Sequence, residues 1–299
     1  ALTEGSFNVA IGRSSLSTDT LGSQSVAVGH NALATQNFTT ATNALNTAVG
    51  FSAGNAVTTG VENVFLGGRA GDATTDADYN TAVGQDALGG NVLGSRSVAI
   101  GTNALLVQTP ATAANMYNVA VGNDAGKAVT TGIQNTLIGG LAGDALTDAD
   151  DNVAIGQFAL STETTGNKTT AIGTNSLGTQ NVAGDSHNVA VGYNAGLNVT
   201  TGIRNTLMGG IAGDALTDAD YNIAIGYQAL TSDVKGSRSV AVGYSALRDQ
   251  SHSTATDTYS TAVGYQAGAS ISTGVYNNLF GGLAGDALTT GDSSTAIGY

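Results

Sequence analysis

The chain of 299 residues contains 43 glycines, one proline (Pro110) and neither cysteine nor tryptophan, and only 10% of its residues are charged. Collagen is excluded because its triple helix needs glycine at every third position and abundant proline, and a membrane-spanning helix is excluded because no apolar run approaches 18 residues. The net charge of −13, from 9 Lys and Arg against 22 Asp and Glu, argues against nucleic acid as a partner and against insertion into an anionic membrane, because the cations that release phosphate counterions are scarce.

A short motif, (V/T)-A-(V/I)-G, recurs along the whole chain, with its glycine at positions 12, 29, 50, 67, 84, 101, 122, 139, 156, 173, 192, 209, 226, 243, 264, 281 and 298. Most intervals are 17 residues, and a longer one of 19 or 21 comes once in every four. Fixed self-similarity indicates a repeat architecture. A unit with one short strand and several turns predicts one coil of a β-solenoid. We therefore predict an all-β fold, a parallel β-solenoid or β-roll of about 17 coils.

In chain order, a partial repeat at residues 1–25 is followed by four super-repeats of four coils each within a single domain, 1–299; their approximate bounds are 26–97, 98–169, 170–239 and 240–299. The first coil of each super-repeat precedes an insertion, and the second ends in a turn like Val-Thr-Thr-Gly. The third carries a doubled glycine and an Asp-rich tail, and the fourth returns to the simple motif.

Each motif predicts a short strand, because its β-branched residues alternate with a period of two. The residue before the glycine is always apolar, and we predict that it points into the coil. The middle residue then faces outward. It is Ala except in the third coils, where an apolar association face is predicted from Phe65, Leu137, Leu207 and Leu279. The alternative is that the chain's own loops cover this face.

Two further positions of the unit have a structural interpretation. The residue before the strand is Asn in eleven of seventeen units, and stacked Asn side chains can hydrogen-bond along a ladder. The motif glycine fits a corner that needs a positive φ or a close backbone approach.

Four insertions follow the first coils, at residues 34–45, 106–117, 178–187 and 248–259. Loops on a rigid scaffold often carry binding residues, so His187 and His252 are candidate ligand contacts; neutral insertion is the alternative. Tyrosines after the motif glycine, which could stack on sugar rings or simply pack, add the candidates Tyr193, Tyr227, Tyr244 and Tyr265.

Recurring carboxylates in the third coils are candidate Ca²⁺ ligands, because this cation prefers several oxygen donors: Asp72, Asp76, Asp78, Asp144, Asp148, Asp150, Asp214, Asp218 and Asp220. Solvated turn acids are the alternative, since the spacing matches no established calcium loop, and no other metal or cofactor is predicted. No histidine has a recurring nucleophile or carboxylate partner, and no phosphate-binding glycine loop is present. The chain is therefore predicted not to be an enzyme.

The runs Ser-Val-Ala-Ile-Gly at 97–101, Ser-Val-Ala-Val-Gly at 25–29 and 239–243 and Asn-Val-Ala-Val-Gly at 118–122 and 188–192 resemble the head domains of trimeric autotransporter adhesins. The run at 260–268, Ser-Thr-Ala-Val-Gly-Tyr-Gln-Ala-Gly, is similar to repeats of bacterial and phage tail-fibre proteins that end in an intramolecular chaperone. The resemblance implies a left-handed parallel β-roll, three chains side by side, an extracellular location on a cell surface or a virion fibre, and a role in attachment.

The sequence thus favours a non-enzymatic fibrous attachment protein, the shaft or head segment of a surface adhesin or tail fibre. A homotrimer is expected, and a host-surface glycan or protein is a candidate ligand. Two alternatives stay open at this point: a purely structural extracellular filament protein, and an ice-binding solenoid, for which the recurring Thr-Thr pairs are sparse.

Overall fold

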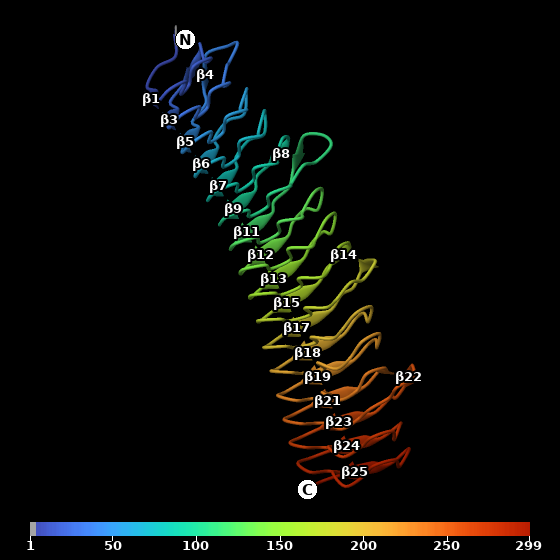
Figure 1. Ribbon diagram of the computed structural model, residues 1–299. Helices are drawn as coiled ribbons and strands as arrows, with labels where there is room; N and C mark the ends of the chain where they lie inside the picture. Colours follow the sequence, from blue (N-terminus) through green and yellow to red (C-terminus); the bar gives the residue numbers. More distant parts are fainter. Residues whose placement is uncertain (1–3) are drawn as a thin grey trace. The chain divides into compact units, whose positions relative to one another are not determined.

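The computed structural model describes residues 4–299 as short parallel strands stacked coil upon coil (Figure 1). The chain divides into two units, residues 1–150 and 151–299. The predicted parallel β-solenoid of about 17 turns is confirmed, with neighbouring strands mostly 17 residues apart. The first three residues of the partial repeat predicted at 1–25 lie outside the described residues.

Unit 1 contains eight three-residue strands, one in each coil: β1 (Val9–Ile11), β3 (Val26–Val28), β5 (Thr47–Val49), β6 (Val64–Leu66), β7 (Thr81–Val83), β9 (Val98–Ile100), β11 (Val119–Val121) and β12 (Thr136–Ile138). From β1 to β12, successive strands of this unit pair in parallel, and equivalent motif positions face each other. Ala27, for example, pairs with Ala48, which pairs with Phe65.

Unit 2 repeats this arrangement with nine strands: β13 (Val153–Ile155), β15 (Thr170–Ile172), β17 (Val189–Val191), β18 (Thr206–Met208), β19 (Ile223–Ile225), β21 (Val240–Val242), β23 (Thr261–Val263), β24 (Asn278–Phe280) and β25 (Thr295–Ile297). All of them are parallel and in register from β13 to β25.

Among residues 4–299, a second kind of strand forms only beside the insertions. Two-residue strands pair in parallel as β2 (Gly22–Ser23) with β4 (Thr42–Asn43), β8 (Gly94–Ser95) with β10 (Ala114–Asn115), β14 (Gly166–Asn167) with β16 (Gly184–Asp185), and β20 (Gly236–Ser237) with β22 (Thr256–Asp257). Each insertion is therefore tied by its backbone to the coil before it.

From β3 to β24 the three-residue strands bury their middle residue and leave the flanking residues at the surface, whereas Ala10 in β1 is exposed and Ala296 in β25 is half-buried. Ala27 and Ala48 are fully buried, whereas Val49, next to its motif glycine, is 39% exposed. The predicted alternation is confirmed, but its predicted direction is wrong. The apolar residue before the glycine points away from the coil interior.

The predicted outward face of the third coils must be corrected for the same reason, because each of its members is 0% exposed inside its coil: Phe65, Leu137, Leu207 and Leu279. The physical cause is the volume of the interior. In first and fourth coils a leucine four residues after the motif glycine fills it, as Leu33 does. In second and third coils glycine stands there, and a Cβ added at Gly54 would lie 2.7 Å from the Phe65 ring. The larger strand residue fills the space that the two glycines leave.

The predicted roles of the motif glycine and of the preceding Asn are both confirmed. Gly84 has φ +133°, and a Cβ added to it would lie 2.6 Å from the Gly101 carbonyl oxygen. Asn63 accepts the N–H of Asn80 at Oδ1, 2.9 Å away, and donates from Nδ2 to the Ala77 carbonyl. The fold is thus held by repeated polar bonds around a narrow apolar interior.

Candidate functional sites

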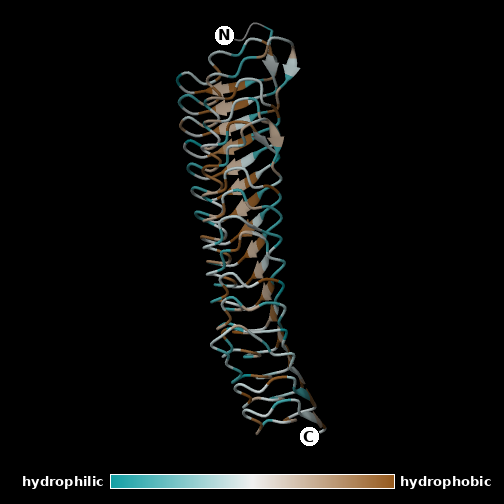
Figure 2. Ribbon diagram, turned by 90° about the vertical axis from the view of Figure 1, so that its right-hand side faces the viewer, coloured by the Kyte–Doolittle hydropathy of each residue, from teal (hydrophilic) through white to brown (hydrophobic). Residues whose placement is uncertain are grey.

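The outward side of the strands carries an apolar row in each unit, formed by the residue before each motif glycine. We call it the outer row; it runs from Ile11 to Ile138 in unit 1 and from Ile155 to Ile297 in unit 2. Figure 2 shows hydrophobic colouring along the strands. Ile100 is 38% exposed and Met208 41%. A contiguous exposed apolar patch of this kind marks an association surface.

A buried polar cluster anchors each insertion, and sequence reasoning missed it. A glutamine just inside the insertion, buried in every case, donates to a buried carboxylate or amide 17 residues earlier; the pairs are Gln36 with Asp19, Gln108 with Asn91, Gln180 with Glu163, and Gln250 with Asp233. The earlier residue also accepts the N–H of the glycine three positions on, as Asp19 does from Gly22 at 3.0 Å. The signal in the sequence was the recurrence of both positions with the super-repeat period.

The earlier residue is a carboxylate or an amide according to whether the insertion offers it a backbone N–H. Asp233 accepts the N–H of His252 at 2.9 Å, and Glu163 accepts that of Val182 at 3.0 Å. In the second super-repeat the equivalent residue is Pro110, which has no N–H, and the acceptor there is the neutral Asn91. A carboxylate is therefore present where a backbone donor faces it, because burial of a charge is costly without such partners.

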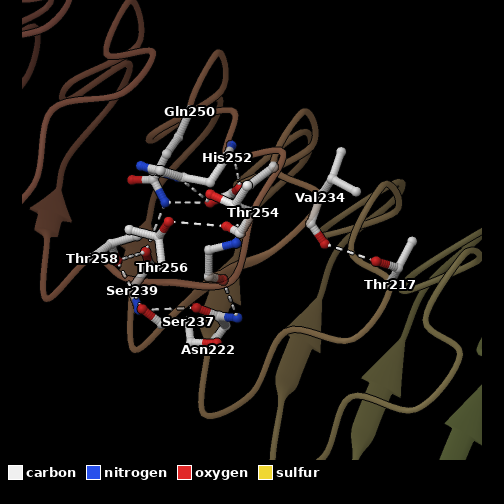
Figure 3. Close-up of polar contacts among 12 residues, drawn as sticks. Thr217, Asn222, Val234, Ser237, Ser239, Gln250, His252, Thr254, Thr256 and Thr258 are labelled. Carbon is white, nitrogen blue, oxygen red and sulfur yellow. Dashed lines mark hydrogen bonds and ion pairs between the residues drawn. The ribbon is translucent and has the colours of Figure 1, made fainter.

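The predicted ligand candidate His252 belongs to this cluster in the fourth super-repeat (Figure 3). Its side chain is 6% exposed, and Nδ1 lies 3.3 Å from Oδ2 of the fully buried Asp233. The hydrogen bond with Asp233 is the main cause of a raised pKa for His252, against the opposing effect of burial. Burial alone would raise the pKa of Asp233, but the hydrogen bonds from His252 and Gln250 lower it. His252 therefore fixes the insertion from inside, whereas His187 is exposed.

The predicted tyrosine candidates lie in one exposed column of unit 2, and three of them stack on one another. Ring centroids of Tyr227 and Tyr244 are 5.7 Å apart, and those of Tyr244 and Tyr265 are 5.3 Å apart. Tyr244 thus has a ring on each face, and offers solvent only its edge and hydroxyl. This arrangement favours packing over sugar stacking for Tyr244; Tyr193 is 60% exposed.

A second aromatic row was not predicted. It lies one residue before the buried Asn position, where Tyr259 stacks on Tyr276 at 5.7 Å and the Arg238 guanidinium lies over Tyr221.

The recurring third-coil aspartates serve separate turns. Asp78 accepts the N–H of Val61 at 2.8 Å, and Asp150 and Asp220 accept equivalent N–H groups. Within residues 4–299, no three His, Cys, Asp or Glu side chains gather closely enough to hold a metal ion. The calcium prediction stays untested, and Asp78, Asp150 and Asp220 each fix the backbone of the preceding coil.

Three stretches of the chain carry a recognisable family repeat, all within or beside first coils and their insertions. Residues 21–42, 223–246 and 251–267 match the YadA head domain repeat (2 copies). The resemblance to trimeric autotransporter adhesin heads is confirmed. The YadA-like segments contain β2, β3, β19, β20, β21, β22 and β23 and residues 251–259 of the insertion at 248–259, so the match includes the strand motif and most of one insertion. No curated protein matches the chain. Within residues 4–299, no helix has the length and apolarity needed to cross a membrane.

Proposed function

We propose that this chain is a segment of a non-enzymatic, extracellular attachment protein that works as a homotrimer on a cell surface or a virion fibre. The observation that carries the proposal is the YadA head repeat, found in both units of a parallel β-solenoid. Trimeric adhesin heads of this type use stacked β-roll coils of three chains side by side.

The outer row supports association of three chains. Its exposed side chains are apolar in every coil, with Val49 at 39% and Phe280 at 42% exposure. Burying apolar surface yields about 25 cal/mol per Å², so a row repeated in every coil supplies a driving force that grows with the number of coils.

Attachment by such a protein is multivalent. Each super-repeat presents equivalent loops and corners, and three chains present them again. Linked weak contacts then bind with an avidity that exceeds any single contact. The structural filament and the ice-binding alternatives predict no saturable binding to host surfaces, and the latter predicts thermal hysteresis.

The test combines two measurements on the chain. Light scattering is expected to give three times the mass of one chain, and a screen against cell surfaces and glycans is expected to give saturable binding. A monomeric mass would contradict the trimer, and a trimer without saturable binding would favour the structural filament.

A further inference from the structure

A pocket of about 220 Å³ lies in unit 1, at the corner that follows the strands, and is lined by Phe51, Gly68, Arg69 and Gln85. Pockets for drug-sized ligands measure roughly 300–1,000 Å³. This one therefore has room for a single ring of a larger molecule.

One wall of the pocket is an aromatic face. Phe51 is 59% exposed, and the His30 ring of the preceding coil stacks on one side of it at 5.4 Å with an interplanar angle of 7°. The next coil places Gly68 at the equivalent position, because β5 and β6 pair in register. Glycine has no side chain, so the second face of Phe51 borders open space.

The backbone does not require glycine at residue 68. Its φ lies outside the left-handed region, and an added Cβ would meet nothing within 4 Å. Phe51 and Gln85 occupy the same position in the adjoining coils. In unit 2 the Tyr227 ring of the next coil occupies the equivalent space beside Gly210, since a Cβ added at Gly210 would lie 3.3 Å from that ring. Because Phe51 stands in the preceding coil, the missing side chain at Gly68 leaves space beside an aromatic ring.

The opposite rim is polar and ordered. Arg69 donates from Nε and Nη2 to the two carboxylate oxygens of Asp86, both at 2.6 Å. Gln85 donates to the same carboxylate at 3.2 Å. An arginine has five N–H donors and a carboxylate has about four acceptor positions, so this rim keeps both donors and acceptors for hydroxyl groups.

The charge of the rim selects against anions. Asp86 balances Arg69, and Asp72 adds a further carboxyl whose pKa is raised by burial and by the charge of Asp86. The local balance is therefore neutral to negative within a chain of net charge −13. An aromatic face carries negative potential and attracts polarised C–H groups.

We propose that this pocket is a subsite for one uncharged pyranose ring of a glycan. The ring lies with its C–H face on Phe51, and its hydroxyls contact the rim of Arg69, Asp86 and Gln85. The proposal rests on the proposed attachment function for its biological role, and names the ligand class of one of its contacts.

The test is saturation-transfer NMR on the whole chain with three neutral probes, the methyl glycosides of galactose, glucose and mannose, and with N-acetylneuraminic acid as the anionic comparison. Transfer to ring C–H protons is expected from at least one neutral probe, and weaker transfer to the acid. Phe51→Ala should weaken binding about tenfold, which corresponds to about 1.4 kcal/mol, because the aromatic face is removed. Gly68→Gln should abolish the signal by filling the pocket.

Gly140→Gln is the matched control. Gly140 holds the same coil position with nothing within 4 Å of an added Cβ, but the coil before it places Asn123 where Phe51 stands. This variant should keep the sugar signal. No transfer from any neutral probe, or equal transfer in Gly68→Gln, would overturn the subsite, as would stronger transfer to the acid.

A change in mass measured by light scattering for Gly68→Gln, but not for Gly140→Gln, would assign the pocket to contact between chains and also overturn the subsite. Sugar transfer without binding to any cell surface would support the subsite and contradict the attachment function. Cell-surface binding that Gly68→Gln leaves unchanged would support the attachment function and contradict the subsite as one of its contacts.

Discussion

At the scale of single residues, the buried Asn and Gln positions act as one bonded system. Oε1 of the cluster glutamine accepts from an Asn side chain at the next strand in three super-repeats: Gln36 from Asn46, Gln108 from Asn118, and Gln180 from Asn188. In the fourth, the equivalent residue is Ser260, and among the described residues Oε1 of Gln250 has no hydrogen-bond partner. A buried unpaired acceptor costs about 1–3 kcal/mol.

Ser260→Asn is therefore expected to stabilise the chain by about 1 kcal/mol, because the new amide would donate to Gln250 as Asn188 does to Gln180. Equilibrium urea unfolding followed by circular dichroism measures the change. Asn188→Ser is the reverse control and should destabilise. An unchanged or lower stability for Ser260→Asn would contradict the assigned bonding pattern.

The Asp233–His252 pair predicts a pH dependence with a definite sign. The pKa of His252 is raised above its ordinary value of 6.5, so its stabilising contribution is complete below that pH and is lost as pH rises through the folded value. The pKa of Asp233 is lowered below its ordinary value of 3.8, so its contribution is complete above that pH and is lost in stronger acid. The pair therefore stabilises the fold most between these two ordinary values.

The pair should accordingly contribute less to the melting temperature of the chain at pH 8 than at pH 5, as measured by thermal unfolding at both pH values. His252→Val, which installs the residue found at Val182, should reduce that difference, because the variant lacks the imidazole that pairs with Asp233. His30 and His187 are present in both proteins, so their titration cancels. An equal difference in melting temperature between pH 5 and pH 8 in the two proteins would refute the contribution of the pair.

At the scale of elements, each coil balances the volume of its strand against that of its corner. Leu33 and Leu88 fill coils whose strand centre is Ala, and Phe65 fills the space beside Gly54 and Gly71. Protein interiors are close-packed, so a change in side-chain volume at the strand position alters the packing at the corner position, and the reverse.

Phe65→Ala should cost about 3–5 kcal/mol, the range for removing a buried aromatic side chain. Phe158→Ala is the matched control, because the same atoms are removed from a side chain that is 38% exposed, and it should cost far less. Urea unfolding measures both. Similar costs for the two variants would contradict the inward orientation of Phe65.

At the scale of the whole molecule, the proposed trimer can be tested at the outer row. Ile100→Glu places a charge in the row without touching the coil interior, and should reduce a trimeric mass to that of one chain, because an unpaired buried charge costs several kcal/mol. Val107→Glu is the control: Val107 is also 38% exposed, but lies in an insertion. Light scattering gives the mass of each variant. A trimer that survives Ile100→Glu would rule out the outer row as its interface.

For the candidate sites, the sequence predicted where the residues lie along the chain but not what they contact. The insertions, the tyrosine column and the aspartate turns lie where their spacing placed them. Their contacts did not follow, because Gln250 meets Asp233 across a whole coil and His252 reaches the same carboxylate from within the insertion. The doubled glycine at Gly68 is visible in the sequence, but the pocket forms because this glycine lies beside the Phe51 ring of the preceding coil, a neighbour about a whole coil away.

The sequence by itself determined the period, the parallel strands, the glycine corners and the Asn ladder, because each is a local requirement repeated in every coil. Only the tertiary structure decided which side of each strand faces inward. Alternation sets the period of a strand but leaves its direction open, and the middle residue faces inward whether the corner carries Leu33 or Gly54, since Ala27 and Ala48 are both buried. The narrow interior takes a small middle residue in most coils, and it takes one as large as Phe65 where glycines stand at the corners of two neighbouring coils, Gly54 and Gly71.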